Sequence, residues 1–238
     1  MASQSDAQWS DEDAATFLRY GPAFVPRRAE QFRVVTTVVA MAAPRLVVDL
    51  CCGEGHLSRA LLDELPDVTV EGLDASEATR RAAQVALHSY EDRFRTARFD
   101  VHQRPWRDHL KPADAFVSSL ALHHLTADEK AAAYGDLRAT LTPGGIFVNA
   151  DLVMAANPAG RVLAAEAWDR SVRDAAGGEA FAAFESLRWN LFRYPDDNDT
   201  DYPLPVAQEL ALMSAAGFVD VDVYWLYAGH AIWGGRAP

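Results

Sequence analysis

The chain has 238 residues, half of them apolar and 24% charged, and its 34 acidic against 22 basic residues give a formal net charge of −12. This length and balance suit one globular domain with a substantial core and room for an inserted cap. An acidic surface repels phosphate backbones and no basic run offsets it, so a nucleic-acid substrate is disfavoured.

No targeting or membrane segment is expected from the sequence. No basic leader precedes an apolar stretch near its start, so no signal peptide is expected. The longest apolar region, residues 34–50, is interrupted by polar residues and a proline and is not expected to span a membrane. Cys51 and Cys52 are the only cysteines, and adjacent cysteines rarely pair. Free thiols and a cytoplasmic location are therefore expected.

After a polar, acidic arm over residues 1–15, strand and helix patterns alternate through the first two thirds of the chain. Predicted helices span residues 29–41, 57–65, 76–90 and 126–141, and predicted strands span residues 45–50, 68–73, 94–100, 113–119 and 146–151. Ser76 is expected to cap one helix, and Thr126 with Glu129 forms a capping box on another. A tight turn is predicted at residues 142–145. This alternation predicts a parallel sheet with helices on both faces.

The pattern changes after residue 157. One or two helices and an acidic, aromatic loop are predicted over residues 158–200, followed by a helix over 206–216 that ends at Gly217. Strands over 218–227 and 230–233 then form a hairpin. The expected organisation is an arm and helix (1–44), a nucleoside-binding core (45–157), a cap (158–204), and a helix with the closing hairpin (205–238).

The most informative stretch is the turn after the first strand. An apolar run ends in Asp49, a small-residue turn follows, and a helix begins after Gly55. A second strand pattern ends in another acid, Asp74. Strand, glycine turn, helix, strand and acid is typical of a nucleoside site at the carboxyl ends of parallel strands. A dinucleotide site instead expects Gly-x-Gly-x-x-Gly, which Cys51 and Ser58 do not match.

Together with two later motifs, this stretch resembles the class I S-adenosylmethionine-dependent methyltransferases. The motifs are Val-Val-Asp-Leu-Cys-Cys-Gly-Glu-Gly at 47–55, Gly-Leu-Asp-Ala-Ser at 72–76, Arg-Phe-Asp-Val at 98–101 and Leu-Thr-Pro-Gly-Gly at 141–145. The resemblance implies an α/β, Rossmann-like, doubly wound seven-stranded sheet of order 3-2-1-4-5-7-6 with strand seven antiparallel. The chain departs from the family at Cys51, where a glycine is more usual.

The resemblance also implies a cofactor, S-adenosyl-L-methionine, with S-adenosyl-L-homocysteine as product, and a set of residues that bind it. Asp49 would bind the methionine amino group, and Asp74 both ribose hydroxyls. The remaining expected contacts are Cys51, Gly53 and Gly55 at the turn, Ala75, Asp100 and Val101 around the adenine, Ser118 and Ser119 along the methionine arm, and Arg28 at its carboxylate. A solvated surface position is the alternative for Arg28.

His123 and His124, just past the fourth strand, are the candidate catalytic residues. Methyl transfer from a sulfonium is an in-line displacement, so a base is needed only if the acceptor must lose a proton. Histidine titrates near neutral pH and suits that role. The alternative is that either ring only packs in the loop. Both histidines with Asp151 have no spacing specific to a metal, and no metal is expected.

A second cluster lies in the predicted cap, where the family binds its acceptor. Trp189 and Tyr194 would wall an apolar or aromatic acceptor, and Asn190 and Arg193 would bind its polar groups. The alternatives for this cluster are a contact in a homodimer or a salt-bridged lid.

The leading functional hypothesis is methyl transfer to an oxygen, nitrogen or carbon atom of a small-molecule acceptor. Two alternatives remain open. The C-terminal half also resembles carboxy-S-adenosylmethionine synthase, through Arg193 ahead of Ala216-Gly217-Phe218. The chain could instead be a non-catalytic, methyltransferase-like protein that binds a partner through its aromatic hairpin.

Overall fold

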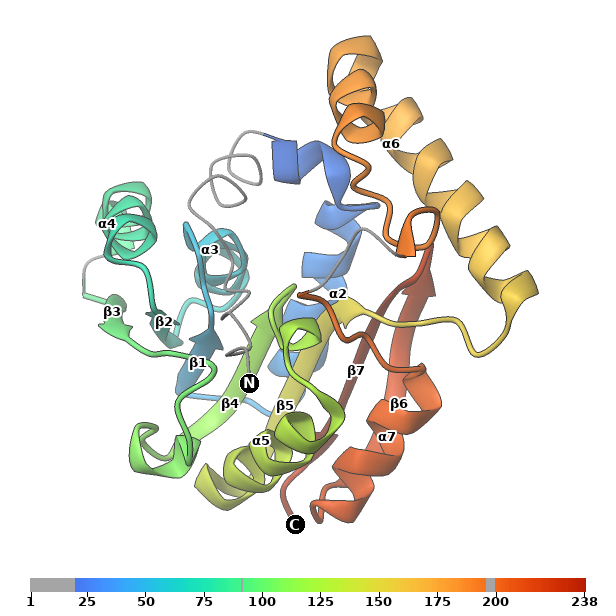
Figure 1. Cartoon of the computed structure of the whole chain (residues 1–238). Helices are drawn as coiled ribbons and strands as arrows, with labels where there is room; N and C mark the ends of the chain where they lie inside the picture. Colours follow the sequence, from blue (N-terminus) through green and yellow to red (C-terminus); the bar gives the residue numbers. More distant parts are fainter. Residues whose placement is uncertain (1–19, 91, 196–199) are drawn as a thin grey trace, which may run out of the picture.

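The computed structural model describes residues 20–90, 92–195 and 200–238 (Figure 1). The polar arm expected over residues 1–15, and residues 196–199 of the acidic loop, lie outside them. The described strands are β1 (Leu46–Leu50), β2 (Thr69–Asp74), β3 (Phe94–Arg98), β4 (Ala113–Ser119), β5 (Leu141–Leu152), β6 (Val219–Tyr227) and β7 (His230–Arg236). The α-helices are α2 (Arg28–Ala40), α3 (His56–Glu64), α4 (Glu77–Ala86), α5 (Ala127–Thr140), α6 (Pro158–Ser186) and α7 (Val206–Ala215).

All of these strands form one seven-stranded sheet with the order β3-β2-β1-β4-β5-β7-β6. The first five strands pair in parallel, and β7 is antiparallel to both of its neighbours, β5 and β6. This confirms the fold that the sequence resemblance implies. Helices cover the sheet, and α6 rises beyond it (Figure 1). Because the first five strands are parallel, their carboxyl ends meet along one edge of the sheet.

The predicted capping signals are confirmed, and several element boundaries differ, most of them by one residue. Helix α4 ends at Ala86 rather than at residue 90. Ser76 caps α4, and Thr126 forms a reciprocal capping box with Glu129 on α5. Strand β5 begins at Leu141, because Leu141 pairs with Ala113 across a register shift, so the predicted tight turn lies inside the strand. Strand β3 ends at Arg98 rather than residue 100, and β7 continues to Arg236 rather than residue 233. The cap contains one long helix, α6.

The core lies on both faces of the sheet and continues under the cap. A third buried cluster joins α6 to the segment before α2, and its members include Phe24, Trp168, Phe184 and Phe192. The Trp168 indole donates to the carbonyl of Phe24 at 2.7 Å, which fixes α6 against that segment. Packing therefore holds the cap over the edge of the sheet where the carboxyl ends of the strands meet.

Among the described residues, no helix has the length and apolar character that crossing a bilayer requires.

A buried ion pair joins α5 to α7. The Lys130 ammonium lies 2.6 Å from one Glu209 oxygen, and the Tyr134 hydroxyl donates to the other at 2.6 Å. Both members of the pair are only 1% exposed. Breaking one half of such a pair leaves an uncompensated buried charge.

Replacing Lys130 with methionine is therefore expected to lower the free energy of unfolding by about 3–5 kcal/mol. Urea unfolding followed by circular dichroism measures this change. The double variant Lys130→Met/Glu209→Leu is the control, because it removes both charges and should recover much of the loss. A double variant no more stable than the single one would contradict this account.

Candidate active site at the carboxyl ends of the strands

A buried acid, Asp49, lies just before the turn that follows β1. Asp49 is 1% exposed, and its carboxylate accepts a 2.6 Å hydrogen bond from the Ser58 hydroxyl. Burial raises the pKa of Asp49 to about 7, against the opposing hydrogen bond from Ser58 and with a smaller contribution from Asp74. The carboxyl group is thus poised to ionise when a cation approaches it.

The backbone of this turn explains its small residues. Gly53 and Gly55 have φ values of +52° and +78°, and a Cβ on Gly55 would lie 2.8 Å from Leu87. A Cβ on Gly53 would meet no atom of the described residues within 4 Å, so these residues leave space for a ligand on that side. Cys51 also has a positive φ, +56°, the conformation that the more usual glycine adopts without strain.

Asp74 ties the turn to the next strand. Its Oδ2 accepts from the Gly53 amide at 2.9 Å, and its Oδ1 accepts from the Ser76 amide and the Thr79 hydroxyl, each at 2.9 Å. A carboxylate offers about four acceptor positions, so some capacity remains for a ligand hydroxyl. The ribose that the resemblance implies would lie beside Gly53 if it bound to Asp74.

The other predicted cofactor residues follow the same edge of the sheet. Ala75 is exposed at the end of β2, while Asp100 and Val101 follow β3 and are half-buried. Asp100 accepts from the His102 amide at 3.0 Å, which holds that loop. The Ser118 hydroxyl is fully buried and donates to the carbonyl of Leu50, whereas Ser119 is half-buried.

Arg28 begins α2 and lies close enough to the turn to interact with it electrostatically. Burial lowers the pKa of Arg28 to about 10, and Glu54, in the turn itself, opposes that change. Burial and the charge of Arg28 together lower the pKa of His56 at the start of α3. The fold thus brings this arginine to the turn, as a carboxylate clamp requires.

His123 and Asp151 form a buried dyad past β4 and at the end of β5. The His123 Nδ1 lies 2.5 Å from Asp151 Oδ1, and the two side chains are 6% and 1% exposed. Backbone amides of Leu122 and His123 donate to Asp151 Oδ2 at 2.9 and 3.1 Å. With Nδ1 donating to the carboxylate, Nε2 is the proton-accepting nitrogen of the neutral ring.

The charges around the dyad favour a basic imidazole. Burial lowers the pKa of His123, but Asp151 and Asp201 outweigh it and leave a net rise above the ordinary value. Burial raises the pKa of Asp151, but His123, Lys130 and a backbone hydrogen bond bring it below its ordinary value. Asp151 therefore stays ionised and orients the ring.

Asp201 is the residue here that the sequence did not indicate. Its Oδ1 lies 2.9 Å from His124 Nδ1 and 3.6 Å from His123 Nε2. Ligand atoms of these three residues lie within 4.8 Å of one another, close enough for a divalent cation. The contact between His124 and Asp201 accounts for that proximity without an ion. No motif surrounds Asp201, and only the fold brings it here.

The predicted acceptor residues have partners in the cap and in the segment before α2. Asn190 donates to Asp169 of α6 at 2.7 Å and to the carbonyl of Ala165. The Arg193 guanidinium also pairs with Asp169. Trp189 packs on Phe24 with the ring centroids 5.3 Å apart, and Tyr194 lies under the Arg188 guanidinium. These contacts fit the salt-bridged lid that the sequence left as an alternative.

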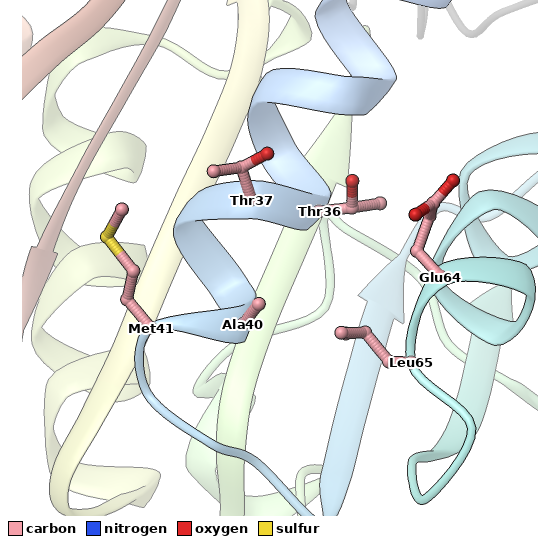
Figure 2. Close-up of a pocket in the computed structure, with 6 residues that line it drawn as sticks. All are labelled: Thr36, Thr37, Ala40, Met41, Glu64 and Leu65. Atoms are coloured by element: carbon pink, nitrogen blue, oxygen red, sulfur yellow. The ribbon is translucent and has the colours of Figure 1, made fainter.

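The hollow drawn in Figure 2 belongs to the opposite edge of the sheet. It is lined by Thr36, Thr37, Ala40, Met41, Glu64 and Leu65. These residues lie in and after the last turns of α2 and α3, near the start of β1, whereas the site lies where β1 ends. No residue predicted to bind cofactor or acceptor lines this hollow, so it is separate from the candidate site.

Comparison with known proteins agrees with this geometry. Residues 47–145 match the model of a methyltransferase domain. An uncharacterized methyltransferase from Geobacillus sp. is 30% identical over 156 residues, covering 64% of this chain and 70% of that protein. Trans-aconitate 2-methyltransferase from Methylobacterium nodulans is 36% identical over 83 residues, covering 33% of this chain and 31% of that protein.

Solved structures share the fold at low identity. An O-methyltransferase family protein from Burkholderia thailandensis has a TM-score of 0.62 at 19% identity, covering 87% of this chain and 55% of that one. Human N-acetylserotonin methyltransferase in complex with S-adenosylmethionine has a TM-score of 0.59 at 17% identity, covering 97% and 60%. This chain thus spans little more than half the length of these structures.

Proposed function

We propose that this chain, which belongs to the class I S-adenosylmethionine-dependent methyltransferases, methylates an oxygen atom of a small-molecule acceptor and uses His123 as general base. The observation that carries the proposal is the buried dyad of His123 and Asp151. An acceptor that already carries a free lone pair needs no base, whereas a hydroxyl must lose its proton. A buried imidazole held in one tautomer by a carboxylate serves the second kind of acceptor.

The residues at the turn fit the cofactor of the family. Asp49 would bind the ammonium of its methionine part, Asp74 its ribose hydroxyls, and Arg28 its carboxylate. The other residues that we expect to contact the cofactor are Cys51, Gly53, Gly55, Ala75, Asp100, Val101, Ser118 and Ser119. When bound, S-adenosylmethionine supplies a methyl group on a positively charged sulfur and leaves as S-adenosylhomocysteine.

The reacting groups of the chain then have separate roles. His123 Nε2 would take the proton of the acceptor hydroxyl, which leaves the acceptor oxygen able to receive the methyl group that the bound cofactor would supply. Asp151 holds the ring and stabilises the imidazolium that forms. The buried Ser118 and the half-buried Ser119 lie at the end of β4, on the approach to this dyad.

Assaying labelled S-adenosylmethionine with a panel of hydroxylated, amine and carboxylic-acid metabolites tests the proposal. We expect transfer to hydroxyl oxygens, with S-adenosylhomocysteine formed in equal amount. Cofactor binding without transfer to any hydroxyl would contradict the proposal. The small-molecule nature of the acceptor, the cytoplasmic location and the homodimer remain predictions.

No observation favours the two alternative functions. The likeness to carboxy-S-adenosylmethionine synthase depended on Arg193, which pairs with Asp169 of α6. A non-catalytic role does not explain a buried base held by a buried carboxylate. Mass spectrometry of the ligand retained through purification distinguishes the synthase-like alternative from a methyltransferase, because a carboxylated cofactor has a higher mass than S-adenosylmethionine.

Cofactor affinity is expected to depend on pH through Asp49, whose pKa of about 7 is raised by burial. The bound ammonium favours the ionised carboxylate, so binding below the free pKa must release one proton. Affinity should therefore fall about tenfold per pH unit as the pH drops below 7. Calorimetric titration between pH 5.5 and 8.5 measures this. The Asp49→Asn variant should bind weakly and without this slope, and a slope that persists would contradict the assignment.

A further inference from the structure

Residues 200–205, which lead from the cap to α7, are bonded to the turn that carries the histidine of the dyad. The Tyr202 amide donates to the carbonyl of His123 at 2.6 Å. Asp201, one residue earlier, has its Oδ1 2.9 Å from His124 Nδ1 and 3.6 Å from His123 Nε2. The segment thus brings a carboxylate to the same two rings whose backbone it contacts.

The buried ammonium of Lys130 connects this segment to the core. It donates to the carbonyl of Tyr202 at 3.0 Å and pairs with Glu209 of α7 at 2.6 Å. Lys130 and Glu209 are each 1% exposed. The peptide that follows Asp201 is therefore bonded to His123 through Tyr202 and, one carbonyl further, to a buried ion pair.

Stability alone does not account for this ion pair. Well-packed apolar residues in place of a buried ion pair often give equal or greater stability. An apolar pair would join α5 to α7, but it could not donate to the carbonyl of Tyr202. The role that requires the ammonium of Lys130 is to bind the peptide beside the dyad.

We infer, on the basis of the proposed function, that Lys130 is a positioning residue for the reaction, and that it holds Asp201 beside the imidazole of His123 through the Tyr202 peptide. Asp201 then acts together with Asp151. The two carboxylates stabilise the imidazolium that forms when His123 takes the proton of the acceptor hydroxyl.

The charge of Asp201 provides a measurable sign of this positioning. Burial and, to a smaller extent, Lys130 lower the pKa of His123, whereas Asp151 and then Asp201 raise it, and the net change is a rise. Removing the charge of Asp201 should therefore lower the pKa of His123, but only while Asp201 lies beside the ring. The other titratable side chains near the dyad are those of Cys51, His124, Tyr134, Glu209 and His230.

Histidine-selective ¹⁵N NMR of the full chain, with a chelator present, follows the titration of His123 without any acceptor. The signal of His123 is assigned from its absence in His123→Gln. In the wild-type background, Asp201→Asn should move this titration to lower pH. In the Lys130→Met/Glu209→Leu background the same replacement should move it less than about half as far, because the two sites are coupled through Tyr202.

Two further backgrounds separate positioning from a loss of stability. Leu61→Ala truncates a fully buried side chain of α3 in a different core cluster, so it destabilises the protein but should keep the full shift. Tyr202→Pro removes the amide that donates to His123 and leaves the buried ion pair intact, so the shift should be smaller than in Tyr202→Ala, which keeps the amide. Thermal unfolding shows which variants are folded.

Three results would overturn the inference and leave the proposed function intact. They are an unchanged His123 titration in Asp201→Asn, an equal loss of the shift in Leu61→Ala, and a full shift in Lys130→Met/Glu209→Leu. If that double variant does not fold, a full shift in Tyr202→Pro is the overturning result instead. Failure to transfer a labelled methyl group to any hydroxyl would overturn the proposed function and the inference with it.

Discussion

Replacing Asp74 with alanine is expected to weaken binding of S-adenosylmethionine about 100-fold or more. In the proposed arrangement this carboxylate accepts from the ribose hydroxyls, and each hydrogen bond to a charged group contributes about 1.5–3 kcal/mol. The same side chain holds the Gly53 amide at 2.9 Å and the start of α4 through Ser76 and Thr79. Its removal therefore takes away ligand contacts and also loosens the turn that surrounds them.

Two further variants separate these effects. Asp74→Asn keeps the size of the side chain and one acceptor oxygen, so its loss of affinity should be smaller. Asp67→Ala removes an exposed acid in the turn before β2 and should bind the cofactor as the wild-type protein does. Calorimetric titration with S-adenosylhomocysteine gives the affinities, and thermal unfolding shows whether Asp74→Ala is folded. A folded Asp74→Ala protein with wild-type affinity would refute the assignment.

The fold and the turn were predictable because their signals are local. Asp49 and Asp74 end apolar runs, and Thr126 with Glu129 marks the start of α5, so each can be read without knowing the rest of the chain. The sheet order came from the family resemblance, which the observed order confirms. The turn at Cys51 shows what the sequence left unexplained: the residue adopts the positive φ that glycine adopts without strain.

The acceptor side was harder to predict because its contacts are long-range. Asp201 reaches His123 across 78 positions of sequence, and Arg193 finds Asp169 on the facing side of α6. The pairing of His123 with Asp151 depends on β4 and β5 being neighbours in the sheet. Sequence patterns report periodicity and turns, but they do not report which polar groups meet after the cap has packed. His124 illustrates this, since its partner Asp201 lies in a loop with no motif.

The substitution with the largest expected effect on turnover is His123→Ala. A general base contributes about 10²–10⁴-fold to rate, and we expect kcat for hydroxyl acceptors to fall within that range. The Asp151→Asn variant should lose at least about tenfold, because the ring is then free to adopt the wrong tautomer. Affinity for S-adenosylmethionine should change little in His123→Ala, since the turn after β1 is untouched. His88→Ala, an exposed histidine before β3, is the matched control and should retain full activity.

The loss of activity in His123→Ala should depend on the acceptor if His123 is a base, and should not if the residue only packs. An acceptor whose hydroxyl is already ionised at the assay pH needs no proton removal, so His123→Ala should lose much less activity towards it. Asp151 and Asp201 raise the pKa of His123 against the effect of burial. This rise fixes the direction in which the rate depends on pH. The free base forms only as the pH rises, so kcat/KM of the wild-type protein should increase with pH and level off above the ordinary histidine range. The His123→Ala profile should lack that step. An equal loss towards ionised and neutral acceptors, with an unchanged profile, would assign His123 a structural role and leave the reaction without a base.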